Sequence, residues 1–129
     1  MIRFCDPPSF PPTTYTGAKR AGLNYEKKVE QWLTRLAREL GWELYSHCWL
    51  AEPLCQPDFV LESPAGCCIV VEAKLTQVDC YAQIEKYKRA LKVAGAEQVT
   101  GIQVCRRVRY FGIKDFESLT DHDHMLLWI

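Results

Sequence analysis

Two apolar segments of the chain carry charged residues where a β-strand would begin or end. Asp58 follows Pro57 and precedes "FVL", and the apolar run "CCIVV" is followed by Glu72 and Lys74. Side chains alternate between the two faces of a strand, so Glu72 and Lys74 share a face about 7 Å apart. The turn-rich link "ESPAG" between the segments predicts an antiparallel hairpin, which brings Asp58 close to Glu72.

A third carboxylate, Glu26, lies in a segment with the periodicity of an amphipathic helix. Apolar residues recur at steps of three and four between Asn24 and Leu40, and Gly41 follows as a residue typical of the position after a helix. Glu26 lies three residues before Val29, which belongs to this apolar stripe. We therefore expect its carboxylate near the inward face of the first helical turn.

Three carboxylates beside one lysine would be unstable as an isolated cluster. Like charges a few ångströms apart force protonation or destabilise the fold, and a buried unpaired charge is costly. A divalent cation removes this cost, and Mg²⁺ commonly binds one or two carboxylates together with water and a substrate phosphate. Lys74 would lie close to the same phosphate or to the attacking water. The residues therefore predict metal-assisted hydrolysis of a phosphodiester.

The elements expected around these residues follow in the order α-β-β-β-α-β. Strands are predicted at residues 42–50, 57–61, 67–74 and 99–105. A second helix is predicted to run to about Ala94, with Asp79 as its cap and Gly95 after its end. The terminal "DHDHMLLWI" predicts a last short strand. The predicted fold class is α/β, with helices packed on a mixed sheet.

The length of 129 residues corresponds to one domain. Residues 1–18 contain four of the seven prolines and are predicted to form an extended arm. Residues 19–129 are predicted to form the single folded domain. The start of the chain has no apolar core typical of a signal peptide, and the longest apolar run is too short to span a bilayer. An intracellular, cytoplasmic location without a membrane is the expectation.

The motifs resemble those of the PD-(D/E)XK nuclease superfamily. "PDFV" at 57–60 and "EAK" at 72–74 are similar to its signature, with thirteen residues between Asp58 and Glu72. "GLNYE" places Glu26 where that family has a helix carboxylate. "QIEKY", with Gln83 and Tyr87, is similar to the QxxxY motif of the RecB-like and lambda-exonuclease-like branch. Archaeal Holliday-junction resolvases and VRR-NUC nucleases are also similar in size and element order.

The resemblance implies a restriction-endonuclease-like core with a divalent cation. Asp58, Glu72 and the backbone carbonyl of Ala73 would bind Mg²⁺ or Mn²⁺, and Glu26 would bind the ion or orient its water. The chain lacks the cysteine pattern of the iron–sulfur members, so no iron–sulfur cluster is expected.

The other motif residues receive supporting roles from the resemblance. Lys74 would position or polarise the attacking water, and Gln83 and Tyr87 would support the site or bind the phosphate. Simpler interpretations remain open. Glu26 could be a solvated first-turn acid, Glu72 and Lys74 a surface pair, Gln83 helix surface and Tyr87 core.

The function implied is a metal-dependent DNA nuclease in phage or mobile-element DNA processing, recombination or repair. One alternative is a dimeric Holliday-junction resolvase, for which the chain would form a homodimer. Another is an inactive DNA-binding module on a nuclease fold. The sequence leaves the substrate structure, the polarity of cutting and the choice between DNA and RNA open.

Basic segments flank the acidic centre of the chain. Residues 41–75 carry one lysine and five acidic residues, whereas residues 19–40 have a surplus of three positive charges and residues 76–111 a surplus of four. Such a pattern suits a cation site whose rim attracts phosphates. A solvated basic edge that discourages strand pairing is the alternative for the arginines. The candidate DNA contacts are Lys19, Arg20, Arg106, Arg107 and Arg109.

Cysteine and histidine patterns predict no further metal centre. The seven cysteines are odd in number and scattered, which predicts reduced thiols packed as small apolar residues. The "DHDH" at residues 121–124 has no partner at zinc-ligand spacing, so no zinc is expected.

Overall fold

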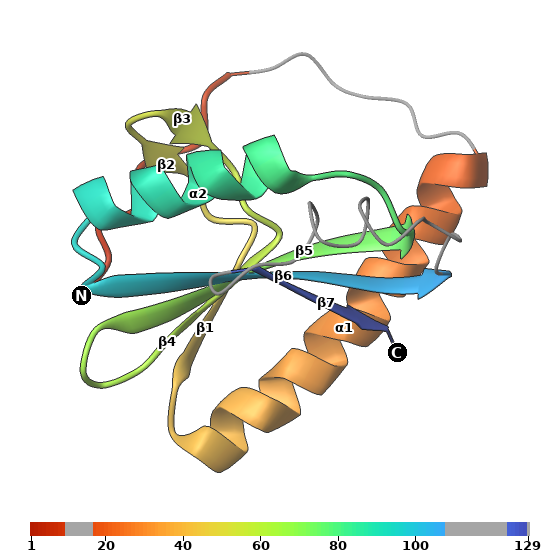
Figure 1. Ribbon diagram of the computed structural model, residues 1–129, viewed down its shortest axis with the longest axis horizontal. Helices are drawn as coiled ribbons and strands as arrows, with labels where there is room; N and C mark the ends of the chain where they lie inside the picture. The colour runs from red at the N-terminus through yellow and green to blue at the C-terminus, as the bar shows by residue number, and fades with distance from the viewer. Residues whose placement is uncertain (10–16, 108–123, 129) are drawn as a thin grey trace.

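The computed structural model describes residues 1–9, 17–107 and 124–128, with side chains described for residues 1–9 and 21–107. Two helices lie on opposite faces of a mixed sheet, as Figure 1 shows. Helix α1 spans Gly17–Leu40 and helix α2 spans Tyr81–Val93. The predicted mixed α/β fold is confirmed. Among the described residues, neither helix is both long enough and apolar enough to cross a membrane.

The sheet has five strands in the order β1-β4-β5-β6-β7, and a separate two-stranded hairpin pairs β2 with β3. Strands β1, β4 and β5 are antiparallel neighbours, whereas β6 and β7 run parallel to β5. The strands are β1 Glu43–Ser46, β2 Leu50–Ala51, β3 Leu54–Cys55, β4 Phe59–Glu62, β5 Cys67–Thr76, β6 Gln98–Arg107 and β7 His124–Trp128.

Helix α1 begins seven residues before the predicted start at Asn24, so the helix includes the last two residues assigned to the arm. The segment "AKRA" at 18–21 consists of strong helix formers, and helical propensity here outweighs the glycine at position 22. The helix ends where predicted, because Gly41 adopts the left-handed φ of 71° that follows many helices.

The predicted strand at 42–50 is wrong, because it breaks at His47. Residues 43–46 form β1, and the chain resumes β structure only at Leu50, in the small hairpin. His47 has a positive φ of 53°, which no extended strand can contain. Its peptide N–H donates to the carbonyl oxygen of Asp58 at 2.9 Å, so the break remains attached to the neighbouring strand.

Alternation along β4 and β5 creates two apolar cores. Val60 and Val70 face α2, where they pack with Ile84. Phe59 and Val71 face α1, where they pack with the buried stripe of that helix. The stripe consists of Tyr25, Val29, Leu33 and Ala37. Both faces of the central strands are thus buried, which fixes their register.

The first residues of the chain pack against the α2 side of the body. The peptide N–H of Arg3 donates to the carbonyl oxygen of Ala94 at 2.9 Å, and that of Cys5 donates to Trp49 at 2.9 Å. Ile2 is buried in the core that α2 covers. These residues lie along the body, while residues 10–16 of the predicted arm lie outside the described part of the chain.

Helix α2 begins and ends one residue inside the predicted limits. Its N-cap residue is Cys80 rather than Asp79, but the Asp79 carboxylate still accepts a hydrogen bond from the peptide N–H of Tyr81 at 3.1 Å. Gly95 has a φ of 118°, in agreement with its predicted place after the helix.

The cysteines behave as small apolar residues. Cys55, Cys68, Cys80 and Cys105 are buried free thiols, and the first three belong to the core under α2. Burial raises the pKa of Cys68 and of Cys80 to about 12, in each case with a further contribution from nearby acidic groups. The predicted packing of thiols in the core is confirmed for these residues.

Replacing Leu33 by alanine tests how far the fold depends on the core under α1. Leu33 is 1% exposed, so Leu33→Ala should lower the free energy of unfolding by about 2–5 kcal/mol in urea denaturation. Leu40 is the matched control, since it lies on the same helix but is 51% exposed. Leu40→Ala should change the free energy of unfolding by less than about 1 kcal/mol. Equal losses for the two variants would contradict the assigned burial.

Candidate active site

His47, Asp58 and Glu72 lie in one row across the ends of three neighbouring strands. The β1–β4 ladder pairs Ser46 with Phe59, and its next step aligns His47 with Asp58. The β4–β5 ladder pairs Phe59 with Val71, and its next step aligns Asp58 with Glu72. The predicted proximity of Asp58 and Glu72 therefore follows from strand register, since directly opposite side chains are neighbours on one face.

The residue before Asp58 explains why the ladder stops here. Continuing the register places Pro57 opposite Ala73, and proline has no N–H to donate. The Asp58 carboxylate pairs with the same residue from the other direction, since its Oδ2 accepts a hydrogen bond from the peptide N–H of Ala73 at 2.8 Å. The N–H and C=O of one extended residue point to the same neighbouring strand. The Ala73 carbonyl is therefore directed toward the side on which Asp58 lies.

Glu72 is a buried carboxylate with an incomplete set of partners. It is 3% exposed, and its Oε1 lies 3.4 Å from the Lys74 ammonium. Its Oε2 accepts no hydrogen bond of good geometry from the described residues, and the Tyr87 hydroxyl is the neighbouring donor whose pKa Glu72 raises. Burial, and secondly the charge of Asp58, raise the pKa of Glu72 to about 8, although Lys74 opposes the shift. The cluster therefore holds more negative charge than its single ammonium group balances.

Glu26 approaches the same group from helix α1. Its side chain is 22% exposed, and its Oε2 lies 3.8 Å from Nε2 of His47. Burial and the charge of Asp58 raise the pKa of Glu26, whereas His47 and Lys74 lower it. Glu26 thus lies beside Asp58 and His47, whereas Glu72 lies beside Asp58 and Lys74, so Asp58 is the residue that the two groups share. The expected place of Glu26 in the first helical turn is wrong, because α1 begins at Gly17, and its side chain is partly buried rather than fully solvated.

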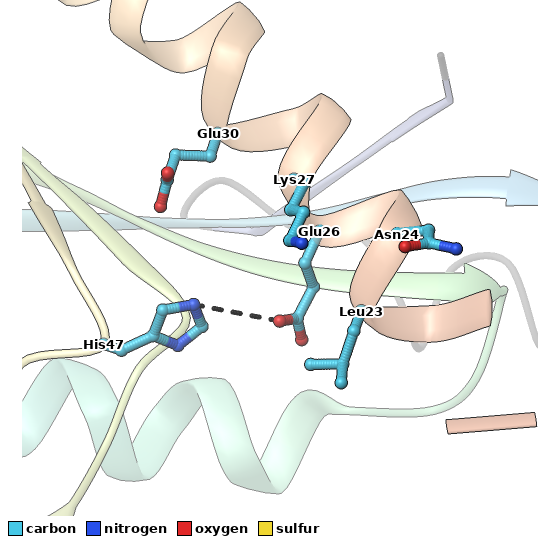
Figure 2. A pocket seen from close by; sticks show the side chains of 6 residues that line it. All are labelled: Leu23, Asn24, Glu26, Lys27, Glu30 and His47. Atoms are coloured by element: carbon cyan, nitrogen blue, oxygen red, sulfur yellow. Dashed lines mark ion pairs between the residues drawn. The ribbon is translucent and has the colours of Figure 1, made fainter. Parts of the chain in front are cut away.

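A pocket of about 450 Å³ lies beside Glu26. Figure 2 shows the imidazole of His47 and the carboxylate of Glu26 directed toward each other across it, with Glu30 one helical turn away. Its lining residues are Leu23, Asn24, Glu26, Lys27, Glu30 and His47. The pocket gives solvent and a bound molecule access to this side of the carboxylate group.

His47 is the site residue that the sequence did not indicate. One potential ligand atom from each of Glu26, His47 and Asp58 lies within 4.8 Å of the others. A lone histidine near the end of a strand carries no motif, and a positive φ has no clear sequence signal at a residue other than glycine or asparagine. Only the pairing of three strands reveals its place.

Gln83 and Tyr87 contact each other on helix α2. The Gln83 amide nitrogen donates to the Tyr87 hydroxyl at 2.8 Å, as their spacing of one turn allows. Tyr87 is buried, and burial together with the charges of Glu72 and Asp58 raises its pKa. Tyr87 thus faces the carboxylate pair, while Gln83 is exposed and reaches the pair through Tyr87.

The candidate DNA contacts are placed only in part. Arg106 and Arg107 are exposed at the end of β6, and the Arg106 guanidinium lies 5.3 Å from the centre of the Tyr25 ring. Arg109 and most of the "DHDH" segment lie outside the described residues, as do the side chains of Lys19 and Arg20.

The donor set fits a divalent cation better than it fits an apolar core. A buried carboxylate oxygen without a donor, beside a second carboxylate, loses the hydration that it had in water. A small cation bound by both carboxylates would restore the lost interactions, and the exposed Glu26 and His47 side leaves room for water ligands. Glu26, His47 and Asp58 are the residues whose ligand atoms lie close enough together to hold such an ion, and Glu72 adds negative charge beside Asp58.

Comparisons of the chain with protein-family models, with curated proteins and with solved structures found no match.

Replacing Glu72 by glutamine tests the cost of its buried carboxylate. In metal-free protein at about pH 8, Glu72→Gln should raise the free energy of unfolding by about 1–3 kcal/mol, because a neutral amide can donate to Asp58. The pKa of Glu72 is raised from 4.5 to about 8 on folding, so wild-type stability falls as the pH rises between these values. Urea unfolding with EDTA should therefore show little gain at pH ~5.

Glu62→Gln is the matched control for this experiment. Glu62 is also a buried carboxylate, but its Oε1 accepts a hydrogen bond from the Tyr45 hydroxyl at 2.9 Å. Its replacement should therefore give no stabilisation at either pH. A gain for Glu62→Gln equal to that for Glu72→Gln would contradict the account of Glu72.

Proposed function

We propose that this protein is a metal-dependent nuclease that hydrolyses DNA phosphodiesters. The observation that carries the proposal is the Glu72 carboxylate, which is buried without a donor to Oε2, beside Asp58 and 3.4 Å from the Lys74 ammonium. A fold retains such an unfavourable arrangement when the site has a use for it. Two carboxylates and a lysine suit a cation and a phosphate together.

The order of the elements supports assignment to the PD-(D/E)XK superfamily. Apart from the small hairpin, the chain follows α1-β1-β4-β5-α2-β6, with β4 antiparallel and β6 parallel to β5. This corresponds to the α-β-β-β-α-β order expected for the restriction-endonuclease-like core. Asp58 directly precedes β4, and Glu72 and Lys74 lie in the second half of β5, which supports the assignment.

Asp58 and Glu72 would hold Mg²⁺ or Mn²⁺, with Glu26 and the Ala73 carbonyl as further oxygen ligands. When bound, the ion supplies Lewis-acid polarisation of the phosphate. The hydrogen bond from the Ala73 N–H fixes the Asp58 carboxylate, so little rearrangement is needed for binding. Oxygen ligands of this kind are those that hard divalent cations prefer.

Lys74 would act on the reacting groups through its ammonium. Its side chain is 34% exposed while Glu72 is almost fully buried, so Nζ can contact both Glu72 and a bound phosphate. There it would stabilise the negative charge that develops as water attacks phosphorus and the bond to the leaving oxygen breaks. Tyr87 would limit water on the α2 side of the carboxylates, and Gln83 would orient its hydroxyl.

The basic residues near α1 suit the nucleic acid backbone. Asn24, Tyr25, Lys28 and Arg106 line a second pocket of about 530 Å³, and Asn24 also lines the pocket beside Glu26. Phosphates held by Lys28 and Arg106 would therefore lie next to the reacting phosphodiester. Phosphate contacts of this kind position a duplex or single strand without reading its sequence.

Asp58→Asn and Lys74→Met should each lower the cleavage rate at least about 100-fold with Mg²⁺ or Mn²⁺, because one removes a metal ligand and the other the charge at the phosphate. Cleavage of linear duplex, single-stranded DNA and a four-way junction is the measurement. Glu43→Gln is the control, since Glu43 is an exposed carboxylate on β1. It should cut at the wild-type rate.

The same assay separates the alternatives. Wild-type rates in either site variant would refute the assigned active site. Symmetric incision of the junction alone would favour the dimeric resolvase. Absence of cleavage on every substrate, together with salt-sensitive binding, would favour an inactive DNA-binding module.

Arg106→Ala should weaken binding of DNA and reduce the slope of log affinity against log salt by about 1, because one phosphate contact is lost. Fluorescence anisotropy in EDTA at several salt concentrations measures both quantities. Arg38→Ala is the matched control, since Arg38 is exposed in the last turn of the same helix that carries Lys28. An equal change in slope for the two variants would indicate that DNA contacts the basic surface non-specifically and does not bind preferentially at Arg106.

A further inference from the structure

The backbone at His47 is left-handed, a conformation that is uncommon outside glycine, although histidine is among the residue types that adopt it more often. Its φ of 53° is a left-handed conformation, which side chains with a Cβ rarely adopt. Hydrogen bonds fix it on both sides: its N–H donates to the Asp58 carbonyl at 2.9 Å, and its carbonyl accepts from the Gln56 amide at 2.9 Å. The surrounding structure therefore holds His47 in a conformation that its own preferences oppose.

This conformation sets the direction of the imidazole. Strand alternation would place His47 on the same face as Tyr45, which packs against the core under α2. Its ring instead lies 5.4 Å from that of Phe59, which faces α1, and its Nε2 lies 3.8 Å from Oε2 of Glu26. The left-handed turn thus brings a nitrogen donor to Glu26 and Asp58.

An ion pair alone does not account for this arrangement. The His47 side chain is 42% exposed, and exposed pairs contribute little to stability. The free-energy cost of a left-handed backbone at a residue other than glycine exceeds the stabilisation from an exposed ion pair. A bound metal ion would account for it, since imidazole nitrogen is a strong ligand of transition metals.

A separate observation points to a ligand at this place. Oε2 of Glu72 is buried without a donor among the described residues, and its carboxyl lies against that of Asp58. Asp58 therefore stands between the unsatisfied Glu72 and the pair formed by Glu26 and His47, and it also belongs to the group of three ligand atoms within 4.8 Å. An ion bound by Glu26, His47 and Asp58 would also offset the negative charge that Glu72 and Asp58 place side by side.

We propose that Nε2 of His47 is a direct ligand in this cation site, together with carboxylate oxygens of Glu26 and Asp58, and that it makes the site select Mn²⁺ over Mg²⁺. The inference rests on the proposed nuclease function and specifies its metal. Mg²⁺ prefers oxygen ligands and octahedral geometry, whereas a mixed nitrogen and oxygen set favours transition ions. His47 in its neutral form would donate the nitrogen lone pair.

Mn²⁺ binding to the metal-free full chain tests this proposal without an activity assay. Electron paramagnetic resonance measures free Mn²⁺ during a titration, and electron spin echo modulation detects nitrogen bound directly to Mn²⁺. The variant is His47→Asn, because asparagine tolerates left-handed φ and has no imidazole. Circular dichroism and thermal unfolding check that the variant folds, and His47→Gly serves as a second variant if it does not.

Wild-type protein should show nitrogen coupling to bound Mn²⁺ and should bind Mn²⁺ about tenfold more tightly than Mg²⁺, measured by competition. His47→Asn should lose the coupling and about tenfold in Mn²⁺ affinity while keeping its Mg²⁺ affinity. Mn²⁺ binding without coupling in the wild type, or coupling that persists in the variant, would overturn the assignment of His47 and leave the proposed nuclease intact. Absence of binding for both ions would overturn both.

Discussion

The hydrogen bond from the Ala73 amide to the Asp58 carboxylate is the interaction on which the rest of the site depends. Pro57 has no N–H to donate to the β4–β5 ladder, and the carboxylate of the next residue accepts the Ala73 N–H. This contact fixes Asp58 where β1 and β4 end against β5, which continues to Thr76. The two flanking residues of the row, His47 and Glu72, are then aligned with it by the registers of the same strands.

The apolar cores on both faces of the sheet stabilise the fold enough to offset the unfavourable environment of Glu72 and the left-handed backbone of His47. Val60 and Val70 lie under α2, and Phe59 and Val71 lie under α1, so the strands that carry the carboxylates cannot shift register without exposing one core. A buried carboxylate without a full set of donors and a left-handed histidine each cost on the order of 1–3 kcal/mol. Burial of one large apolar side chain contributes about 1.5–3 kcal/mol, so a few core residues offset both.

The sequence predicted the structure well where residue periodicity and a turn signal alone determine which residues become neighbours. Alternation along "CCIVVEAK" and the short link to "PDFV" predicted that Asp58 and Glu72 are neighbours, and helical spacing predicted that Glu26 approaches Asp58. It failed at His47, because the break in the strand there depends on a hydrogen bond from the His47 N–H to the Asp58 carbonyl and one from the Gln56 amide to the His47 carbonyl, and these partners lie outside the local sequence. The two-residue strands β2 and β3 were missed for a similar reason, since segments so short carry no periodic signal.

The charges of the site are arranged unequally on the two faces of the sheet. On the α2 side, Glu72 is nearly inaccessible and Tyr87 covers it, whereas on the α1 side Glu26 and His47 border an open pocket. Electrostatic interactions are strongest where water is excluded, so Glu72 can anchor a cation firmly while the α1 side remains open for exchange of water and substrate. Asp58 joins the two sides because it stands at the end of β4, where the sheet no longer separates them. The site therefore has a buried, solvent-excluded face at Glu72 and a solvent-accessible face at Glu26 and His47.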